Sequence, residues 1–288
     1  HLGMKGIDTL EQLAEVKRIV VEVARDCAVL NADDPLVLRM AGHTDARNIC
    51  YVTLNPKHAL VREHIRAGGR ACALEAGVNG QMITLYDRSS HIPLVWTHLI
   101  PATLEGRARH NVQNAMFAAA MAFSLGIKLD AIRQGLRTFD TTFFQAPGRM
   151  NVFDEHPFKV LFDYGHNAHA VGMLADLAGR LDVAGRRIVV LAGPGDRRAE
   201  DLRAIAHAVA GRFDHVDDVA LQAGGDVDRG HRLLELHHVG GGEHGGEVVD
   251  GLGAVGAGHR AGSTRSSSRS STAAALARLL ALRSPIHR

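Results

Sequence analysis

The chain has 288 residues, 46% of them hydrophobic, enough for a sizeable core and two domains of ordinary size. Its 33 Lys and Arg residues nearly balance its 31 Asp and Glu residues, and a net charge of +2 gives no overall field that would favour nucleic acid or a membrane as partner. Three cysteines are too few and too widely spaced for a disulfide framework. No apolar run approaches the roughly 20 residues that cross a bilayer, and no signal-peptide pattern opens the chain. These features predict a cytoplasmic protein with a small-molecule partner.

Two further features indicate a piece of a larger protein with an altered end. The sequence opens at His1, directly before a predicted helix, which is typical of a fragment. Of the 31 glycines, 13 fall between Gly224 and Gly262, and residues 263–272 are almost all Ser, Arg and Thr. Such a composition does not build a packed core. We expect an irregular tail over 215–288, with a frameshift as the leading hypothesis and a natural disordered linker as the alternative.

The first half of the chain is predicted to mix helices and strands. Asp8 is a candidate N-cap with Glu11 three residues on, and apolar residues then recur near helical spacing, which predicts a helix over 9–25. The apolar run 27–30 ends in the turn motif NADDP, a pattern typical of a buried strand that delivers polar residues at its end. Residues 48–99 alternate with Gly and Pro turns, and short strands are expected around Tyr51, Ala71, Ile83 and Leu94.

The second half predicts more helices and then a change of pattern. Helices are expected over 109–125, ending at Gly126, and over 130–139. After a Pro-Gly turn at 144–148 the pattern becomes strand, helix, strand, helix. The predicted segments are 160–164, 171–181, 187–192 and 200–210. The sequence therefore predicts an α/β fold with domains at 1–145 and 146–214, the second built on a parallel sheet.

Two polar motifs lie at element ends where ligands commonly bind. His110, Asn111 and Asn114 open a predicted helix, where backbone N–H groups favour polar or anionic ligands, although Asn111 could simply cap the helix. Asp163 and His166 follow a predicted strand and would emerge at the carboxyl edge of a sheet. The alternative for this second motif is a turn whose Asp and Asn side chains bond the local backbone.

Phosphate-binding sequence signals are weak. Neither GxxxxGK[ST] nor GxGxxG occurs in the chain. The turn at Gly195 and Asp196 follows a predicted strand and is compatible with a close approach to a nucleotide, or with a simple turn. Arg149 is compatible with a phosphate contact or with an ordinary surface position, and Lys17 would normally be a solvated charge on its helix.

The order of the motifs resembles that of the Mur ligase family. They run HLG, a Lys on the following helix, NADDP, HNVQNA, PGRMNVF, DYGHNAHA and LAGPGDRR. More narrowly, the opening HLGMKGIDTLEQLAEVKR, the segment REHIRAGGRA and the last two motifs resemble the C-terminal ligase half of the cyanophycin synthetases. The resemblance covers His1 to about Asp214. It implies a partial central ATP-binding domain followed by a Rossmann-like C-terminal ligase domain.

The resemblance also implies which residues bind the nucleotide. Asn111 and Asn114 would approach the adenine of ATP, and Arg149 its phosphates. Asp163 would hold the ribose hydroxyls, and His166 would lie at the phosphate or acyl phosphate. Catalysis would depend on His166 together with Lys17 of the first predicted helix.

The metal and substrate positions are implied in the same way. His1 would bind Mg²⁺, and Lys17, once carbamylated, would become a second, carboxylate-like Mg²⁺ ligand. Gly195 and Asp196 would line the amino-acid side. The phosphate-binding loop of the family and its acidic magnesium ligand are absent from this sequence.

The function implied is ATP-dependent formation of an amide bond between a carboxylate and an amino acid or peptide-like substrate, through an acyl phosphate. Synthesis of an arginine and aspartate polymer is the specific version, and peptidoglycan-precursor or folylpolyglutamate ligation are the neighbouring ones. A noncatalytic remnant that binds a nucleotide or a partner chain is the alternative, and the absent phosphate loop favours inactivity of this chain alone. Homo-oligomerisation of the complete enzyme is left open.

Overall fold

The computed structural model describes residues 2–3, 5–155, 157–192 and 198–218. The chain divides into two compact units, His1–Gly185 and Arg186–Arg288. The domain boundary expected near 144–148 stays a prediction. Within the described residues, no helix is long and apolar enough to cross a membrane.

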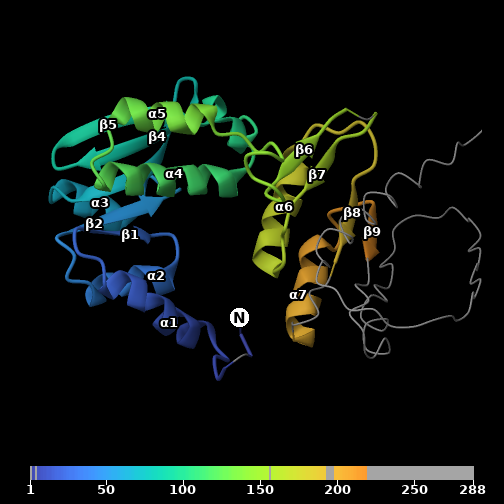
Figure 1. The fold of residues 1–288 in the computed structure, drawn as a ribbon, viewed down its shortest axis with the longest axis horizontal. Coiled ribbons are helices and arrows are strands. Elements are labelled where there is room, and N and C mark those ends of the chain that lie inside the picture. The colour runs from blue at the N-terminus through green and yellow to red at the C-terminus, as the bar shows by residue number, and fades with distance from the viewer. Residues whose placement is uncertain (1, 4, 156, 193–197, 219–288) are drawn as a thin grey trace, which may run out of the picture. The chain divides into compact units, whose positions relative to one another are not determined.

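The first unit is built on a five-stranded sheet in the order β1-β2-β3-β4-β5 (Figure 1). Strands β1, β2 and β3 are parallel, and β4 and β5 continue the sheet antiparallel. The strands expected around Tyr51, Ala71, Ile83 and Leu94 are therefore confirmed. The bounds are β1 Cys27–Asn31, β2 Asn48–Thr53, β3 Arg70–Gly77, β4 Gly80–Asp87 and β5 Ser90–Trp96.

Parallel strands need crossover connections, and short helices supply them here. Helix α2 (Pro35–Arg39) and the 3-10 turn η1 (Met40–His43) join β1 to β2, and α3 (Ala59–Arg66) joins β2 to β3. Asp34 caps α2 through hydrogen bonds from two backbone N–H groups, with Pro at the first helical position. The predicted NADDP turn is thus the start of a helix.

Helices cover both faces of the sheet (Figure 1). One core packs α4 and α5 against Val52, Leu74 and Leu85, which are almost fully buried. The other packs apolar side chains of α1, α2 and α3 against Leu30, Tyr51 and their neighbours. Because alternate residues of a strand point to opposite faces, the nearly continuous apolar strands of this sequence suit a sheet that is buried on both sides.

Helix α1 (Leu10–Glu22) confirms the first predicted helix but not its cap or its burial. The N-cap is Thr9, whose hydroxyl accepts from the backbone of Gln12, while the Gln12 side chain accepts from the backbone of Thr9, so the capping box lies one residue later than predicted. None of the helix residues is buried. The exposed apolar side chains of the helix and its end are Leu10, Val16, Ile19, Val20 and Val23.

Helices α4 (Arg109–Ser124) and α5 (Leu129–Thr138) agree with the predicted bounds within one residue. The expected stripe of α4 is in the core, with Val112, Ala115, Met116 and Ala119 buried. Gly126 adopts φ 77 just beyond the helix, a conformation that glycine reaches without a steric penalty. The turns η2 (Thr97–Leu99) and η3 (Pro101–Thr103) precede α4.

The last elements of the first unit correct one prediction. Strand β7 (Val160–Phe162) confirms the strand expected at 160–164, but it pairs with β6 (Asn151–Phe153) in an antiparallel ladder and not in the parallel sheet that was expected. The link between them is too short for a parallel crossover, which needs a dozen or more residues. Helix α6 (Ala168–Arg180) follows, three residues earlier than expected, because Asn167 caps it by accepting from the backbone of Ala170.

The second unit contains β8 (Ile188–Leu191), α7 (Ala199–Val209) and β9 (His215–Asp218). β8 and β9 are parallel, as the predicted strand and helix pattern requires. Ile205 and Val209 are the buried residues of α7. The first four residues of the predicted tail therefore form a strand, and residues 219–288 lie outside the described part of the chain.

Candidate functional site

The NADDP and HNVQNA motifs meet at the carboxyl edge of the parallel strands. The Asn31 side-chain oxygen accepts from the backbone of Asp33 at 3.1 Å and from Nε2 of Gln113 at 3.5 Å. The Asp33 carboxylate accepts from the Thr53 hydroxyl and, at 2.7 Å, from the backbone of Leu54. These bonds tie the ends of β1 and β2 to α4, so the edge where ligands of α/β sheets bind is preorganised.

Asn111 and Asn114 lie one turn apart at the start of α4. The N-cap of this helix is Ala108, so the alternative that Asn111 caps it is wrong. Asn111 instead donates to the carbonyl of Ala102 at 2.7 Å, and its oxygen accepts from Asn114 at 3.1 Å. Asn114 is exposed, so this amide is free to approach a ligand.

Asp163 and Asn111 are connected through Met150. The Asp163 Oδ2 atom accepts from the backbone N–H of Met150 at 2.9 Å, and the Met150 sulfur lies 3.8 Å from the Asn111 amide nitrogen. Met150 is 2% exposed and adopts φ 50. Among the described residues, no hydrogen bond uses the second oxygen of Asp163, Oδ1, which leaves an acceptor for a ligand hydroxyl. The two predicted motifs thus belong to one site.

Arg149 and His166 lie beside this site. Arg149 is exposed, and His166 is partly exposed. The guanidinium of Arg149 stacks over the ring of Tyr164, 5.6 Å from its centroid. His166 Nδ1 lies 3.1 Å from the carbonyl of Tyr164, so this nitrogen carries the proton that it donates. The other ring nitrogen, Nε2, is then the one available to a ligand. Asn167 has the backbone-capping role that the alternative for this motif described.

His110 belongs to the predicted motif at the start of α4, and the structure adds one feature of its ring. Its Nδ1 atom is buried without a hydrogen-bond partner. Burial lowers the pKa of His110, an effect that the Asp163 carboxylate opposes and His169 reinforces. The Nδ1 atom of this half-buried imidazole is a polar group that a ligand could satisfy, and its burial could not be foreseen from sequence spacing.

The structure does not show the predicted metal ligands or the predicted substrate contacts in this site. Lys17 is exposed on α1, while His1, Gly195 and Asp196 lie outside the described residues. In the described part of the chain, no group of three or more His, Cys, Asp or Glu side chains could hold a metal ion. The residues present fit a nucleoside, through Asp163 Oδ1, Asn114 and the unsatisfied His110, and offer Arg149 as a cation for phosphate. The magnesium site stays a prediction.

Comparison with known proteins matches residues 148–257 to the Mur ligase glutamate ligase domain, a range that continues past Asp214. A cyanophycin synthetase from Synechocystis sp. is 38% identical over 234 residues, 79% of this chain and 26% of that protein. Another from Trichormus variabilis is 42% identical over 225 residues, 75% of this chain and 24% of that protein. The chain thus spans about a quarter of the length of these curated relatives.

More distant matches carry other names. A UDP-N-acetylmuramate–L-alanine ligase from Burkholderia multivorans is 34% identical over 202 residues, 67% of this chain and 38% of that protein. The solved folylpolyglutamate synthase from Thermotoga maritima is 17% identical with a TM-score of 0.44, over 70% of this chain and 49% of that one. A murein peptide ligase from Psychrobacter arcticus is 13% identical with a TM-score of 0.47, over 72% of this chain and 46% of that one. The sequence matches confirm that the chain is related to the Mur ligase family, with cyanophycin synthetases among its relatives.

Proposed function

We propose that this chain is part of an ATP-dependent ligase that joins an amino acid to a peptide carboxylate, in the synthesis of an arginine and aspartate polymer. The observation that carries the proposal is the junction at Met150, which brings Asp163 and Asn111 into one site with an unsatisfied buried nitrogen on His110. The relatedness to cyanophycin synthetases over three quarters of the chain supports the choice of reaction.

The proposed roles follow from the chemistry of each side chain. Asp163 Oδ1 accepts a hydrogen bond from a ribose hydroxyl, and the Asn111 and Asn114 pair faces the base. Arg149, held over Tyr164, offers a positive charge to the phosphates, and His166 presents Nε2 toward the same end. Positioning and charge neutralisation are the main tasks of a protein in phosphoryl transfer, which is why these roles need no nucleophile from the chain.

The reaction itself has two steps. A substrate carboxylate oxygen bonds to the γ-phosphorus of ATP and ADP leaves, giving an acyl phosphate. The amine nitrogen of the incoming amino acid then bonds to the carbonyl carbon, loses a proton, and phosphate leaves as the amide forms. His1 and a carbamylated Lys17 are proposed as the Mg²⁺ ligands, and Gly195 and Asp196 as the contacts to the incoming amino acid.

Calorimetric titration of the 288-residue chain with ADP tests the nucleotide site. We expect binding that Asp163→Ala weakens by about tenfold to a hundredfold, since a hydrogen bond to a charged group contributes roughly 1.5–3 kcal/mol. Asp154→Ala is the matched control, because Asp154 is an exposed carboxylate beyond β6 with no role in the site. Absence of ADP binding, or equal affinities for the two variants, would remove the proposed site.

The identity of the amino acid needs a second measurement. ADP release from ATP by a longer enzyme that contains this chain together with the phosphate-binding loop should depend on arginine and on a peptide that carries aspartate side chains. Glutamate or alanine in place of arginine should not support it. ADP release that follows either of these amino acids instead would assign the chain to another reaction of the Mur ligase group.

A further inference from the structure

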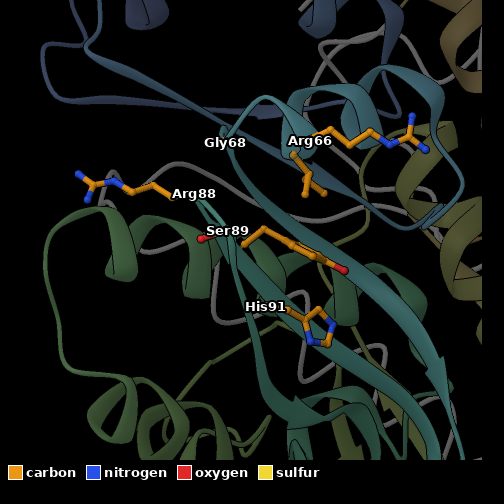
Figure 2. Close-up of a pocket in the computed structure, with 7 residues that line it drawn as sticks. Arg66, Gly68, Arg88, Ser89 and His91 are labelled. Atoms are coloured by element: carbon orange, nitrogen blue, oxygen red, sulfur yellow. The ribbon is translucent and has the colours of Figure 1, made fainter.

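Two adjoining pockets form one groove along α3. The larger, of about 480 Å³, is lined by Arg66, Tyr86, Arg88, Ser89 and His91 among others (Figure 2). The smaller, of about 280 Å³, includes Thr53, Arg62 and Glu75. Ile65, Arg66 and Tyr86 line both pockets, so the two are continuous. We call the combined feature the arginine groove. It begins at Thr53, the last residue of parallel strand β2, and reaches the turn between β4 and β5.

The arginine groove carries unpaired positive charge. In the described part of the chain, no ion pair or side-chain hydrogen bond involves the guanidinium of Arg62, Arg66 or Arg88, and all three side chains are exposed. Five other arginines of the first unit each form an ion pair with a carboxylate. These are Arg18, Arg47, Arg70, Arg107 and Arg133.

Acidic side chains also lie near the groove: Glu63 on α3, Glu75 on β3 and Asp87 at the end of β4. The two carboxylate oxygens of Glu75 accept from the Tyr86 hydroxyl and from His91 Nε2, the latter at 3.0 Å. Asp87 is bonded to Arg70 at 2.9 Å. Hydrogen bonding leaves the negative charge of Glu75 on the groove wall, and Glu63 follows Arg62 on α3, so three arginines face two carboxylates and a charge of +1 remains (3 − 2). The local field is therefore positive even though the whole chain is nearly neutral.

The spacing of the arginines suits an extended ligand. Arg62 and Arg66 are four residues apart on α3, which places them on one helix face with a rise of about 6 Å between them. Alternate side chains on one side of an extended peptide are about 6.6 Å apart. Figure 2 shows Arg66 and Arg88 extending to opposite sides of the pocket. A compact anion would meet one of these groups, whereas a chain of carboxylates can meet all three.

We propose that the arginine groove binds an acidic peptide, the carboxylate-bearing substrate, in an extended conformation that leads toward the carboxyl edge of the parallel strands. The inference rests on the proposed ligase function, because a ligase that extends a peptide must hold the chain whose carboxylate reacts. Ser89 adds a hydroxyl donor along the groove, whereas the Tyr86 hydroxyl and His91 Nε2 are bonded to Glu75. The groove lies on the first unit and does not include the residues of the nucleotide site.

Fluorescence anisotropy of a labelled deca-aspartate peptide, at low salt, tests the proposal on the 288-residue chain. We expect saturable binding that Arg62→Gln, Arg66→Gln and Arg88→Gln together weaken at least tenfold. The matched control combines Arg25→Gln, Arg39→Gln and Arg137→Gln, which removes three exposed charges outside the groove and should leave the affinity within twofold. Arg66→Glu is a second variant, which should weaken binding more than Arg66→Gln does.

Three results would overturn the acidic-peptide proposal: no binding of deca-aspartate, equal losses in the two triple variants, or equal affinity and equal groove dependence for a ten-phosphate single-stranded oligonucleotide. ADP titration of the groove variant separates the two proposals. Unchanged ADP affinity with lost peptide affinity supports both. Peptide binding through the groove in a chain that fails to bind ADP would refute the ligase site and retain the groove as a peptide site.

Discussion

Asn151 holds the segment that carries Arg149 and Met150, and replacing it tests how that segment is fixed. Its side chain is 1% exposed and makes three hydrogen bonds. The oxygen accepts from the backbone of Gly148 at 2.7 Å, and the nitrogen donates to the carbonyls of Thr141 at 2.7 Å and Ala146 at 2.9 Å. Asn151→Asp keeps the acceptor and removes both donors while leaving the shape almost unchanged.

The expected loss follows from the two carbonyls. The carbonyl of Ala146 also accepts from the backbone of Arg149 at 3.1 Å, whereas that of Thr141 loses its partner, so Asn151→Asp should destabilise the segment by about 1–3 kcal/mol. Against a total stability of roughly 5–15 kcal/mol, such a loss opens the segment locally. Backbone amides of residues 141–151 should therefore exchange with deuterium faster, and ADP affinity should fall because Arg149 and the Met150 N–H are no longer fixed.

A matched substitution and a pH series sharpen this test. Asn167→Asp should be neutral or slightly stabilising, because an exposed N-cap aspartate still accepts from Ala170 and its charge suits a helix N-terminus. The carboxylate introduced at position 151 faces two carbonyls, which raises its pKa in the folded state, so the variant loses stability as pH rises through the range above the unfolded value. Wild-type exchange rates in Asn151→Asp, or equal effects at the two positions, would refute the reasoning.

Three further perturbations have defined outcomes. Arg88 adopts φ 56 in the turn between β4 and β5, a backbone conformation that glycine reaches without strain. Arg88→Gly should therefore raise the free energy of unfolding by about 1 kcal/mol in urea titrations, while it weakens binding of the deca-aspartate peptide. An unchanged or lower stability would contradict the strain. Burial raises the pKa of the Cys50 and Cys72 thiols. Iodoacetamide at pH 8 should therefore leave both thiols unmodified in the folded chain and label them after unfolding, as peptide mass analysis would show. Rapid labelling in the native state would contradict this. Burial also lowers the pKa of His110, so the unfolded chain takes up this proton first and stability falls as pH drops through the unfolded value near 6.5. His110→Gln should remove that part of the loss below about pH 6.5 in thermal unfolding, and an identical pH dependence of the two proteins would count against it.

Local patterns predicted the elements of this chain better than the surroundings of those elements. Apolar spacing located α1, α4 and α5 because helix periodicity depends on a few neighbouring residues. The same spacing does not say what covers the stripe, and Val20 on α1 is 71% exposed. Strand pairing was the weaker point, since β7 reads as a buried strand whether its partner runs parallel or antiparallel. Its pairing was decided by the short connection from β6, a feature of chain length and not of apolar content.

The candidate site shows the same division. Asp163 and Asn111 could be chosen from the sequence because polar residues at element ends are recognisable. Their connection could not, since it passes through the backbone N–H and the sulfur of Met150, neither of which marks a motif. The unsatisfied nitrogen of His110 depends on burial by residues distant in the sequence, so it appears only in the folded chain.

The arginine groove and the nucleotide site together bear on how a ligase would bring its two reactants together. Thr53 lines the groove and its hydroxyl donates to Asp33, the residue whose backbone donates to Asn31. Asn31 in turn accepts from Gln113 on α4, the helix that carries Asn111 and Asn114. A continuous set of hydrogen bonds therefore links the inner end of the groove to the helix that faces the proposed nucleotide. Because these bonds fix the carboxyl edge before any ligand arrives, a peptide held in the groove would meet a preorganised edge, which reduces the entropy lost in aligning its carboxylate.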